Sequence, residues 1–161
     1  MIADLKKDGT LKLEIRREFP FPRDLVFETW VNKEHLHRWM GPTEDITMAI
    51  VEVDAREGGS YRLGFQEHGE PVKIVHGVYQ AINRPEKLVF TWIWEPPMPD
   101  AGIETLVTVE FIETSKGTEI LLKHERFASK EVCELHYRGW SGTFDKLENR
   151  LPQIATLGKQ K

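Results

Sequence analysis

The sequence predicts an α+β domain in which a curved, seven-stranded antiparallel sheet wraps around one long C-terminal helix. Apolar residues alternate with polar ones from residue 11, and six further strand-like runs lie between residues 46 and 126. After residue 129, apolar residues recur every three or four positions, as in an amphipathic helix. The predicted order is one strand, two short helices, six strands and the long helix.

The segment from residue 11 to residue 42 predicts the first strand and both short helices. Apolar and charged residues alternate from Leu11 to Ile15, as in a strand with one buried face. Pro20 and Pro22 interrupt this pattern, and a proline suits the first turn of a helix because its missing N–H would have no partner there. Two groups of apolar residues at helical spacing follow, at 27–31 and 36–40, until Gly41-Pro42 ends the second.

The six strand-like runs that follow predict a meander. They cover approximately residues 46–54, 59–67, 71–81, 87–95, 104–113 and 117–126. Most of the turns between them are short, so consecutive strands should be antiparallel neighbours. Gly58-Gly59 indicates such a turn rather than a phosphate-binding loop, because it joins two strands and opens no helix. The longer connection from Glu95 to Ile103 is rich in proline, and we expect it to act as a lid.

The longest predicted helix begins after Ser129, a residue suited to capping its N-terminus. Its apolar stripe runs from Cys133 through Trp140 to Ile154 in steps of three and four. Pro152 lies within this stripe and should kink or end the helix. We expect residues 10–157 to form a single domain, between an N-terminal tail of residues 1–9 and a C-terminal tail of residues 158–161.

Composition and charge narrow the compartment and the partners. The 161 residues suit one domain, and Cys133 is the single cysteine, which fits a reducing compartment better than a disulfide-stapled scaffold. The N-terminus lacks the apolar segment of a signal peptide, and no apolar run approaches the ~20 residues that span a membrane. The net charge of -4 comes from interspersed charges without a basic stripe. We therefore expect a cytoplasmic protein that binds neither nucleic acid nor a membrane.

The predicted helices are too few to cover the concave face of a seven-stranded sheet. Large rings lie on that face, so a sheet that curls around the long helix should pack tightly in its middle and stay open at one end. Such an opening suits an apolar small molecule and requires no cofactor. We expect the cavity to be formed by Trp30, Trp39, Tyr61, Phe65, Phe90, Trp92, Trp94, Val109, Leu122, His124, His136, Tyr137, Trp140 and Phe144.

Several motifs resemble one known family. The motifs are Asp54-Ala-Arg-Glu-Gly-Gly-Ser-Tyr-Arg62, Gly77-Val-Tyr79, Arg84-Pro-Glu-Lys-Leu-Val-Phe-Thr-Trp92, the run from Thr118 to His124, and Gly139-Trp140. Together they resemble the branch of the START-like (SRPBCC, helix-grip) superfamily that is related to the activator of heat shock protein 90 ATPase. The resemblance covers about Thr10 to Ile154. It implies the helix-grip fold, in which the space between sheet and C-terminal helix commonly holds lipids, polyketide-like compounds or other apolar ligands.

Three functions follow from these expectations, with ligand binding first. The second is an enzyme, such as a cyclase, dehydratase or hydrolase, that uses the same cavity with His124, His136 or Tyr137 as proton-handling groups. The third is a chaperone-interacting module that resembles the ATPase activator. The eukaryotic activator carries a separate N-terminal domain for chaperone contact, to which nothing in this sequence corresponds. A chaperone, or a second copy of the chain, is therefore a secondary expectation as partner.

The candidate reactive residues also have simpler interpretations. A histidine on an apolar face, such as His124 or His136, is more often a hydrogen-bonded part of the core than a ligand contact. Cys133 and His136 are three residues apart on the predicted helix, but no third residue is spaced to orient the histidine for nucleophilic chemistry. His35 and His37 would point to different sides of a helix, so we expect no metal site.

Overall fold

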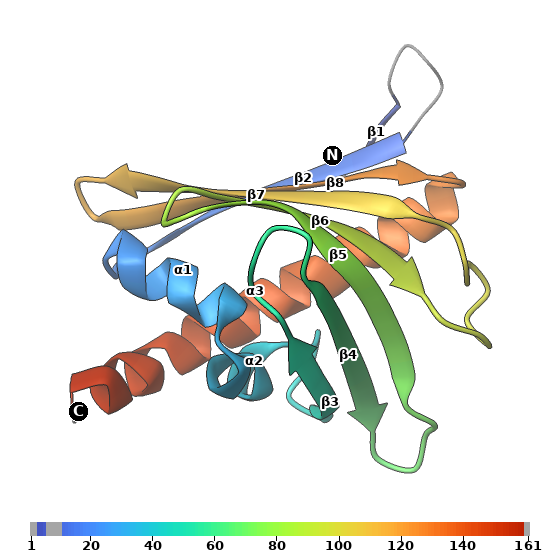
Figure 1. Cartoon of the computed structure of the whole chain (residues 1–161), viewed down its shortest axis with the longest axis horizontal. Helices are drawn as coiled ribbons and strands as arrows, with labels where there is room; N and C mark the ends of the chain where they lie inside the picture. The colour runs from blue at the N-terminus through green and yellow to red at the C-terminus, as the bar shows by residue number, and fades with distance from the viewer. Residues whose placement is uncertain (1–2, 6–10, 160–161) are drawn as a thin grey trace.

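The computed structural model describes residues 3–5 and 11–159 of the chain. Figure 1 shows a sheet that curves around the long helix α3, with two short helices beside it under the same concave face. The elements are β1 (Ala3–Leu5), β2 (Leu11–Phe19), α1 (Arg23–Val31), α2 (Lys33–Trp39), β3 (Ile46–Val53), β4 (Ser60–Glu67), β5 (Lys73–Asn83), β6 (Lys87–Trp94), β7 (Thr105–Thr114), β8 (Gly117–Phe127) and α3 (Lys130–Lys159).

All neighbouring strands of the sheet are antiparallel. Among the described residues the strand order is β1-β2-β8-β7-β6-β5-β4-β3, so the strands from β3 to β8 form a meander and β2 pairs with the last of them. The seven predicted strands, the two short helices and the long C-terminal helix are confirmed. The helix-grip architecture is therefore the fold of this chain.

The predicted N-terminal tail is corrected in one part. Ala3–Leu5 forms β1, which pairs with the start of β2, with Ala3 opposite Leu13. A three-residue strand is too short to show an alternating pattern in the sequence, but the edge of β2 offers unpaired N–H and C=O groups to any adjacent extended segment. The other residues of the predicted tail, 1–2 and 6–9, lie outside the described residues.

The turn between β3 and β4 confirms the structural interpretation of its glycines. The Gly59 N–H donates to the Arg56 carbonyl at 2.8 Å, and a Cβ at Gly59 would lie 2.1 Å from the Asp54 carbonyl oxygen. Gly58 has a φ of 83°, in the left-handed region that favours glycine. The Arg56 guanidinium pairs with the Asp54 carboxylate at 2.9 Å across the same turn. These residues fix a hairpin.

Helix α3 begins as predicted and ends later than predicted. The Ser129 hydroxyl accepts a hydrogen bond from the Val132 N–H at 3.2 Å, which caps the first turn. Pro152 does not end the helix, which continues through Lys159 and so includes two residues of the predicted C-terminal tail. Proline removes one helical hydrogen bond, but Leu151 and Ile154 on either side of it are fully buried. Their packing holds the helix together past the proline.

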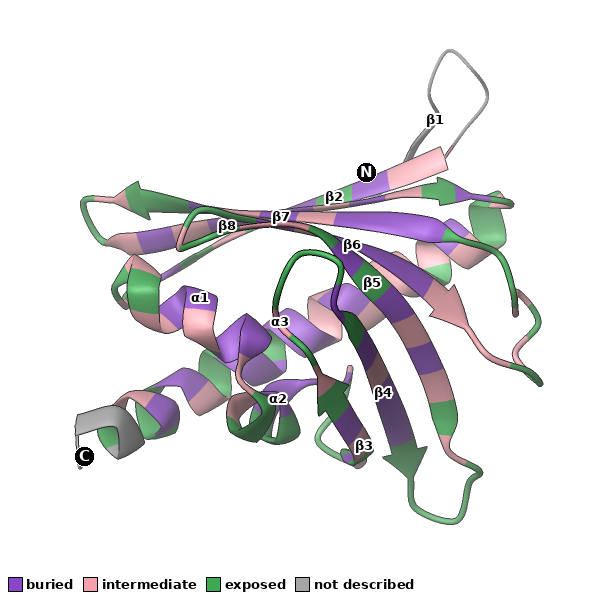
Figure 2. Cartoon of the chain, in the orientation of Figure 1, coloured by how far each residue is buried: buried purple, intermediate pink, exposed green. Residues whose placement is uncertain are grey.

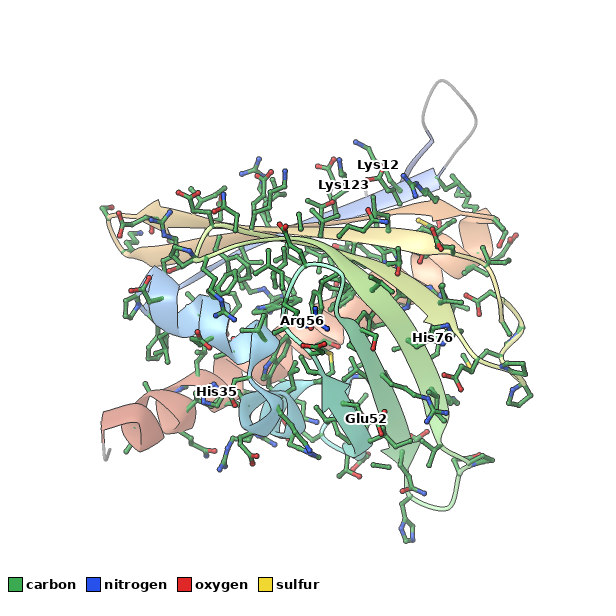
Figure 3. The ribbon with its side chains drawn as sticks, viewed as in Figure 1. Lys12, His35, Glu52, Arg56, His76 and Lys123 are labelled. Atoms are coloured by element: carbon green, nitrogen blue, oxygen red, sulfur yellow. The ribbon has the colours of Figure 1, made fainter. Side chains whose placement is uncertain are left out.

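Burial divides the two faces of the sheet. Figure 2 shows buried and more exposed residues alternating along the strands, as one packed and one solvated face require. Lys12 and Lys123 lie on the face turned away from α3 (Figure 3), where the Lys12 ammonium pairs with Glu14 at 2.8 Å. On the concave face, the rings of Phe27 and Phe111 meet edge to face at 5.1 Å. The core therefore lies between the sheet and the helices.

Candidate functional site

A cavity of about 420 Å³ lies between the concave face of the sheet and α3. Phe65 of β4, Trp92 and Trp94 of β6 and, at the start of β5, Lys73 belong to its sheet wall. The lining is predominantly apolar, and the volume falls within the range of roughly 300–1,000 Å³ that is typical of small-molecule sites. The cavity therefore has the size and the character of a binding site for an apolar molecule.

One stripe of α3 forms the opposite wall. Val132, His136, Gly139 and Thr143 line the cavity and follow one another at steps of three and four residues, together with Leu135. This stripe lies beside the fully buried stripe of Phe144, Leu147 and Leu151. Helix α3 therefore packs into the core with one set of residues and lines the cavity with another. Leu135 is 60% exposed, which places an apolar side chain at the cavity mouth.

Two connecting segments form the rim of the cavity. Met98, Pro99 and Asp100 come from the connection between β6 and β7, the segment expected to act as a lid. Met40 and Pro42 come from the connection between α2 and β3, and Ile46 is the first residue of β3. None of these six side chains was predicted to line the cavity. Five of them lie in irregular connections, which carry no periodic pattern that shows where a side chain points.

The rim segment between α2 and β3 is fastened to α3 by two close contacts. Gly142 lies so near this segment that a Cβ on it would be 2.1 Å from the Pro42 carbonyl oxygen. One turn later, the Lys146 ammonium donates to the carbonyls of Ile46 at 2.8 Å and of Met40 at 3.4 Å. Desolvation by burial lowers the pKa of Lys146, and these two carbonyls together with that of Thr43, at 3.4 Å, accept its hydrogen bonds. The rim is therefore held against the helix.

His124 lies beneath the cavity and is fully buried. The Trp140 Nε1–H donates to its Nδ1 at 3.0 Å, so the neutral ring carries its proton on Nε2. Nε2–H then donates to the Thr105 hydroxyl at 2.7 Å, and that hydroxyl donates to the Trp92 carbonyl at 2.8 Å. Burial, with a smaller contribution from the neighbouring His136, holds the pKa of His124 well below its ordinary value. Every polar atom of this chain of hydrogen bonds has a partner.

His136, which precedes Trp140 by one turn of α3, also accepts a hydrogen bond from an indole. The Trp94 Nε1–H donates to its Nε2 at 2.9 Å, and its own Nδ1–H donates to the Val132 carbonyl at 2.8 Å. The rings of His124 and His136 lie 5.2 Å apart. Desolvation is the main cause that lowers the pKa of His136. Both imidazoles are neutral, and an indole N–H occupies the lone pair that each would need to act as a general base.

The predicted cavity residues divide into three groups. Those that line the cavity are Phe65, Trp92, Trp94, His136 and Trp140. Those around a small inner chamber of about 20 Å³, which shares Trp92 with the cavity, are Trp30, Tyr61 and Phe90. The rest belong to the packed core or its edge and line neither space: Trp39, Val109, Leu122, His124, Tyr137 and Phe144. Each group contains large aromatic residues at core spacing, so only the three-dimensional arrangement separates the groups.

The other candidate reactive residues do not form a reactive site. Cys133 is fully buried and does not line the cavity. Within residues 3–5 and 11–159, no three His, Cys, Asp or Glu side chains gather as a metal site would require. In the same part of the chain, every helix is too short or too polar to cross a bilayer.

A second hollow lies on the outer side of β3, β4 and β5 and is polar. His76 and Glu52, labelled in Figure 3, belong to its lining. The Arg62 guanidinium forms two hydrogen bonds to the Glu95 carboxylate, at 2.9 and 3.0 Å, and His76 lies 3.0 Å from the same group. The bonds from Arg62 are the main cause that lowers the pKa of Glu95. These charges already satisfy one another, so the apolar cavity is the better candidate site.

Residues 20–151 match the model of the family described as "Activator of Hsp90 ATPase homolog 1-like protein". The chain belongs to this family. The resemblance stated from the motifs is thereby confirmed, both for the family and for its helix-grip fold. A comparison with curated proteins finds no match for this family member.

Solved structures of similar proteins show the same fold. The AHSA1 protein from Silicibacter pomeroyi is 23% identical, with a TM-score of 0.79 over 88% of this chain and 98% of that one. Protein NE0264 from Nitrosomonas europaea is 24% identical, with a TM-score of 0.76 over 88% and 94% of the two chains. CalU16 from Micromonospora echinospora is 21% identical, with a TM-score of 0.65 over 98% and 88%. These likenesses establish the fold of this family member.

Proposed function

We propose that this protein binds an apolar small molecule, such as a lipid-like, polyketide-like or aromatic compound, in the cavity between the sheet and α3. One observation carries the proposal: a cavity of about 420 Å³ with a predominantly apolar lining opens to the surface beside Leu135. Burial of apolar ligand surface contributes about 25 cal/mol per Å² before the costs of association are subtracted. A molecule that fills the cavity therefore binds mainly through the hydrophobic effect.

The state of the histidines favours binding over catalysis as the first hypothesis. His124 does not line the cavity, and the indole N–H of Trp140 occupies its Nδ1. His136 reaches the cavity, but Trp94 occupies its Nε2. General base catalysis would first require one of these buried hydrogen bonds to break, at a cost of about 1–3 kcal/mol.

Titration with the uncharged dye N-phenyl-1-naphthylamine tests the proposal, because the fluorescence of this dye rises in apolar surroundings. Gly139 lines the cavity, and a Cβ built on it meets no atom within 4 Å. Gly139→Phe should therefore place a ring in the cavity. Arg138→Phe is the matched control, since Arg138 is exposed and is not a cavity residue.

We expect the wild-type protein and Arg138→Phe to bind one dye molecule per chain with similar affinity. Gly139→Phe should bind at least tenfold more weakly, because its ring occupies ligand volume. Absence of saturable binding by the wild-type protein would overturn the proposal. Equal affinity in all three proteins would show that the dye binds elsewhere, and would also overturn it.

A further inference from the structure

The five tryptophans differ in whether their indole N–H groups have an acceptor. Trp39 donates to the Thr29 carbonyl at 2.7 Å, while Trp94 and Trp140 donate to His136 and His124. The Nε1–H groups of Trp30 and Trp92 have no acceptor among the residues that the structure describes. Both residues are nonetheless buried, with 4% and 5% of their surface exposed. A buried donor without an acceptor costs about 1–3 kcal/mol, so two of them in one protein require an explanation.

Both residues with an unpartnered donor line the inner chamber, which shares part of its wall with the cavity. Trp92 forms part of the wall of the 420 Å³ cavity and also of the inner chamber of about 20 Å³. Trp30 lines the inner chamber as well. Met40, whose side chain is flexible, is the other residue that the two spaces share. The inner chamber has room for about one oxygen-sized group.

The chemistry of the chamber favours one kind of group. An indole N–H is a donor only, so both free groups require an acceptor. The hydroxyl of Tyr61, a residue of the chamber wall, already donates to the Thr91 carbonyl. The chamber lining contains no cationic side chain. A carboxylate would be desolvated there without a counter-charge, whereas a neutral carbonyl oxygen would not carry that penalty.

We propose that the ligand carries a neutral acceptor oxygen at its inner end, which accepts a hydrogen bond from the Trp92 Nε1–H. The ligand class is therefore an apolar ketone, ester or quinone rather than a hydrocarbon, an alcohol that must donate, or a fatty-acid anion held at its carboxylate. Trp30 supplies a second donor at the same chamber. This inference rests on the proposed function and narrows the kind of molecule that the cavity takes.

A matched pair of probes separates the acceptor oxygen from apolar burial. The first is 6-propionyl-2-(dimethylamino)naphthalene, a ketone, and the second is its 6-propyl analogue, which lacks the carbonyl. Each is titrated into the wild-type protein, Trp92→Phe and Trp94→Phe. Trp94→Phe is the control, because Trp94 lines the same cavity but already donates to His136. The measured quantity is the ratio of the affinities for the ketone and for the propyl probe.

The ratio should fall roughly two- to tenfold in Trp92→Phe relative to the wild-type protein, as the loss of one hydrogen bond predicts. It should stay unchanged in Trp94→Phe. In ¹H–¹⁵N spectra of the wild-type protein, the ketone should shift the Trp92 indole N–H resonance downfield more than the propyl probe does. The Trp39 resonance should not move, because its N–H already has an acceptor.

The outcomes distinguish this inference from the proposed function. Suppose that both probes bind the wild-type protein, but the Trp92 indole N–H has the same chemical shift with the ketone as with the propyl probe. The inference is then wrong and the binding function stands. The inference is also wrong if the chamber holds only a water molecule. In that case the ratio of the affinities for the ketone and the propyl probe is equal in all three proteins. If neither probe binds, the proposed function itself fails.

Discussion

The indole Nε1–H of Trp140 donates a hydrogen bond to Nδ1 of the fully buried His124, over 3.0 Å, and thereby keeps the imidazole neutral. Trp94 does the same for His136 over 2.9 Å. The two tryptophans line the cavity, and the two histidines tie them to the interior. Aromatic walls held by buried hydrogen bonds are rigid, which reduces the entropy lost when a ligand binds.

The neutral histidines make stability depend on pH. Burial lowers the pKa of His124 well below its ordinary value of 6.5, and it also lowers the pKa of His136. Below about pH 6.5 the unfolded chain therefore binds protons that the folded chain does not, and the free energy of unfolding decreases as the pH falls. The decrease is at most about 1.4 kcal/mol per pH unit for each histidine, and it is absent above pH 7.

Urea unfolding between pH 5 and pH 8 measures this dependence. His124→Gln provides the comparison, since an amide can both accept and donate but does not titrate in this range. Its free energy of unfolding should fall less steeply with decreasing pH. Titration of both imidazoles with ordinary midpoints in ¹⁵N spectra of the folded wild-type protein would contradict the hydrogen-bond assignment.

Thr105 links His124 to the sheet, and its removal should be costly. Thr105→Val keeps the shape of the side chain but leaves the His124 Nε2–H and the Trp92 carbonyl without the hydroxyl. We expect a loss of about 1–3 kcal/mol in the free energy of unfolding. Thr108→Val, on the same strand but less buried, should change it by less than about 0.5 kcal/mol. Equal effects of the two substitutions would show that the hydrogen-bonded chain contributes nothing.

Two glycines of α3 should respond to alanine with opposite signs. A Cβ at Gly139 meets no atom within 4 Å, so Gly139→Ala should raise the free energy of unfolding by about 0.5–1 kcal/mol through helix propensity. A Cβ at Gly142 would lie 2.1 Å from the Pro42 carbonyl oxygen. Gly142→Ala must therefore push the rim segment away from α3 and should lower the melting temperature. Stabilisation by both substitutions would contradict the close approach at Gly142.

Lys146 should matter to both stability and binding. Lys146→Met removes the donor to the carbonyls of Ile46 and Met40, and should cost about 1–3 kcal/mol. Because these residues form the cavity rim, affinity for N-phenyl-1-naphthylamine should fall as well. Lys130→Met, at an exposed position of the same helix, is the control and should alter neither quantity appreciably. Unchanged dye affinity in Lys146→Met would show that the rim segment does not contribute to dye binding.

The sequence was sufficient for the fold because its patterns are periodic. Alternation at residues 11–15 and helical spacing after Ser129 each specify an element and its buried face. Two exceptions have physical causes. The strand Ala3–Leu5 is too short to show a period, and the effect of Pro152 is outweighed by the burial of its neighbours, which depends on tertiary packing.

The site was less predictable, since a ring that packs in the core and a ring that lines a cavity look alike in a sequence. Trp39 and Trp92 illustrate this: both are buried aromatic residues at core spacing, but only Trp92 faces unfilled space. Rim residues such as Met98 lie in connections whose sequence has no periodic apolar pattern, so the direction of their side chains could not be predicted. The spacing of Val132, His136 and Gly139 did contain a signal, a second stripe beside the core stripe of α3.

Native mass spectrometry of the purified wild-type protein, followed by organic extraction, tests the binding function most directly. We predict a complex with one apolar compound per chain, recovered in the extract, and its loss in Gly139→Phe. A wild-type protein that carries the mass of the chain alone, and that also fails to take up added N-phenyl-1-naphthylamine or the naphthyl ketone, would contradict the binding function.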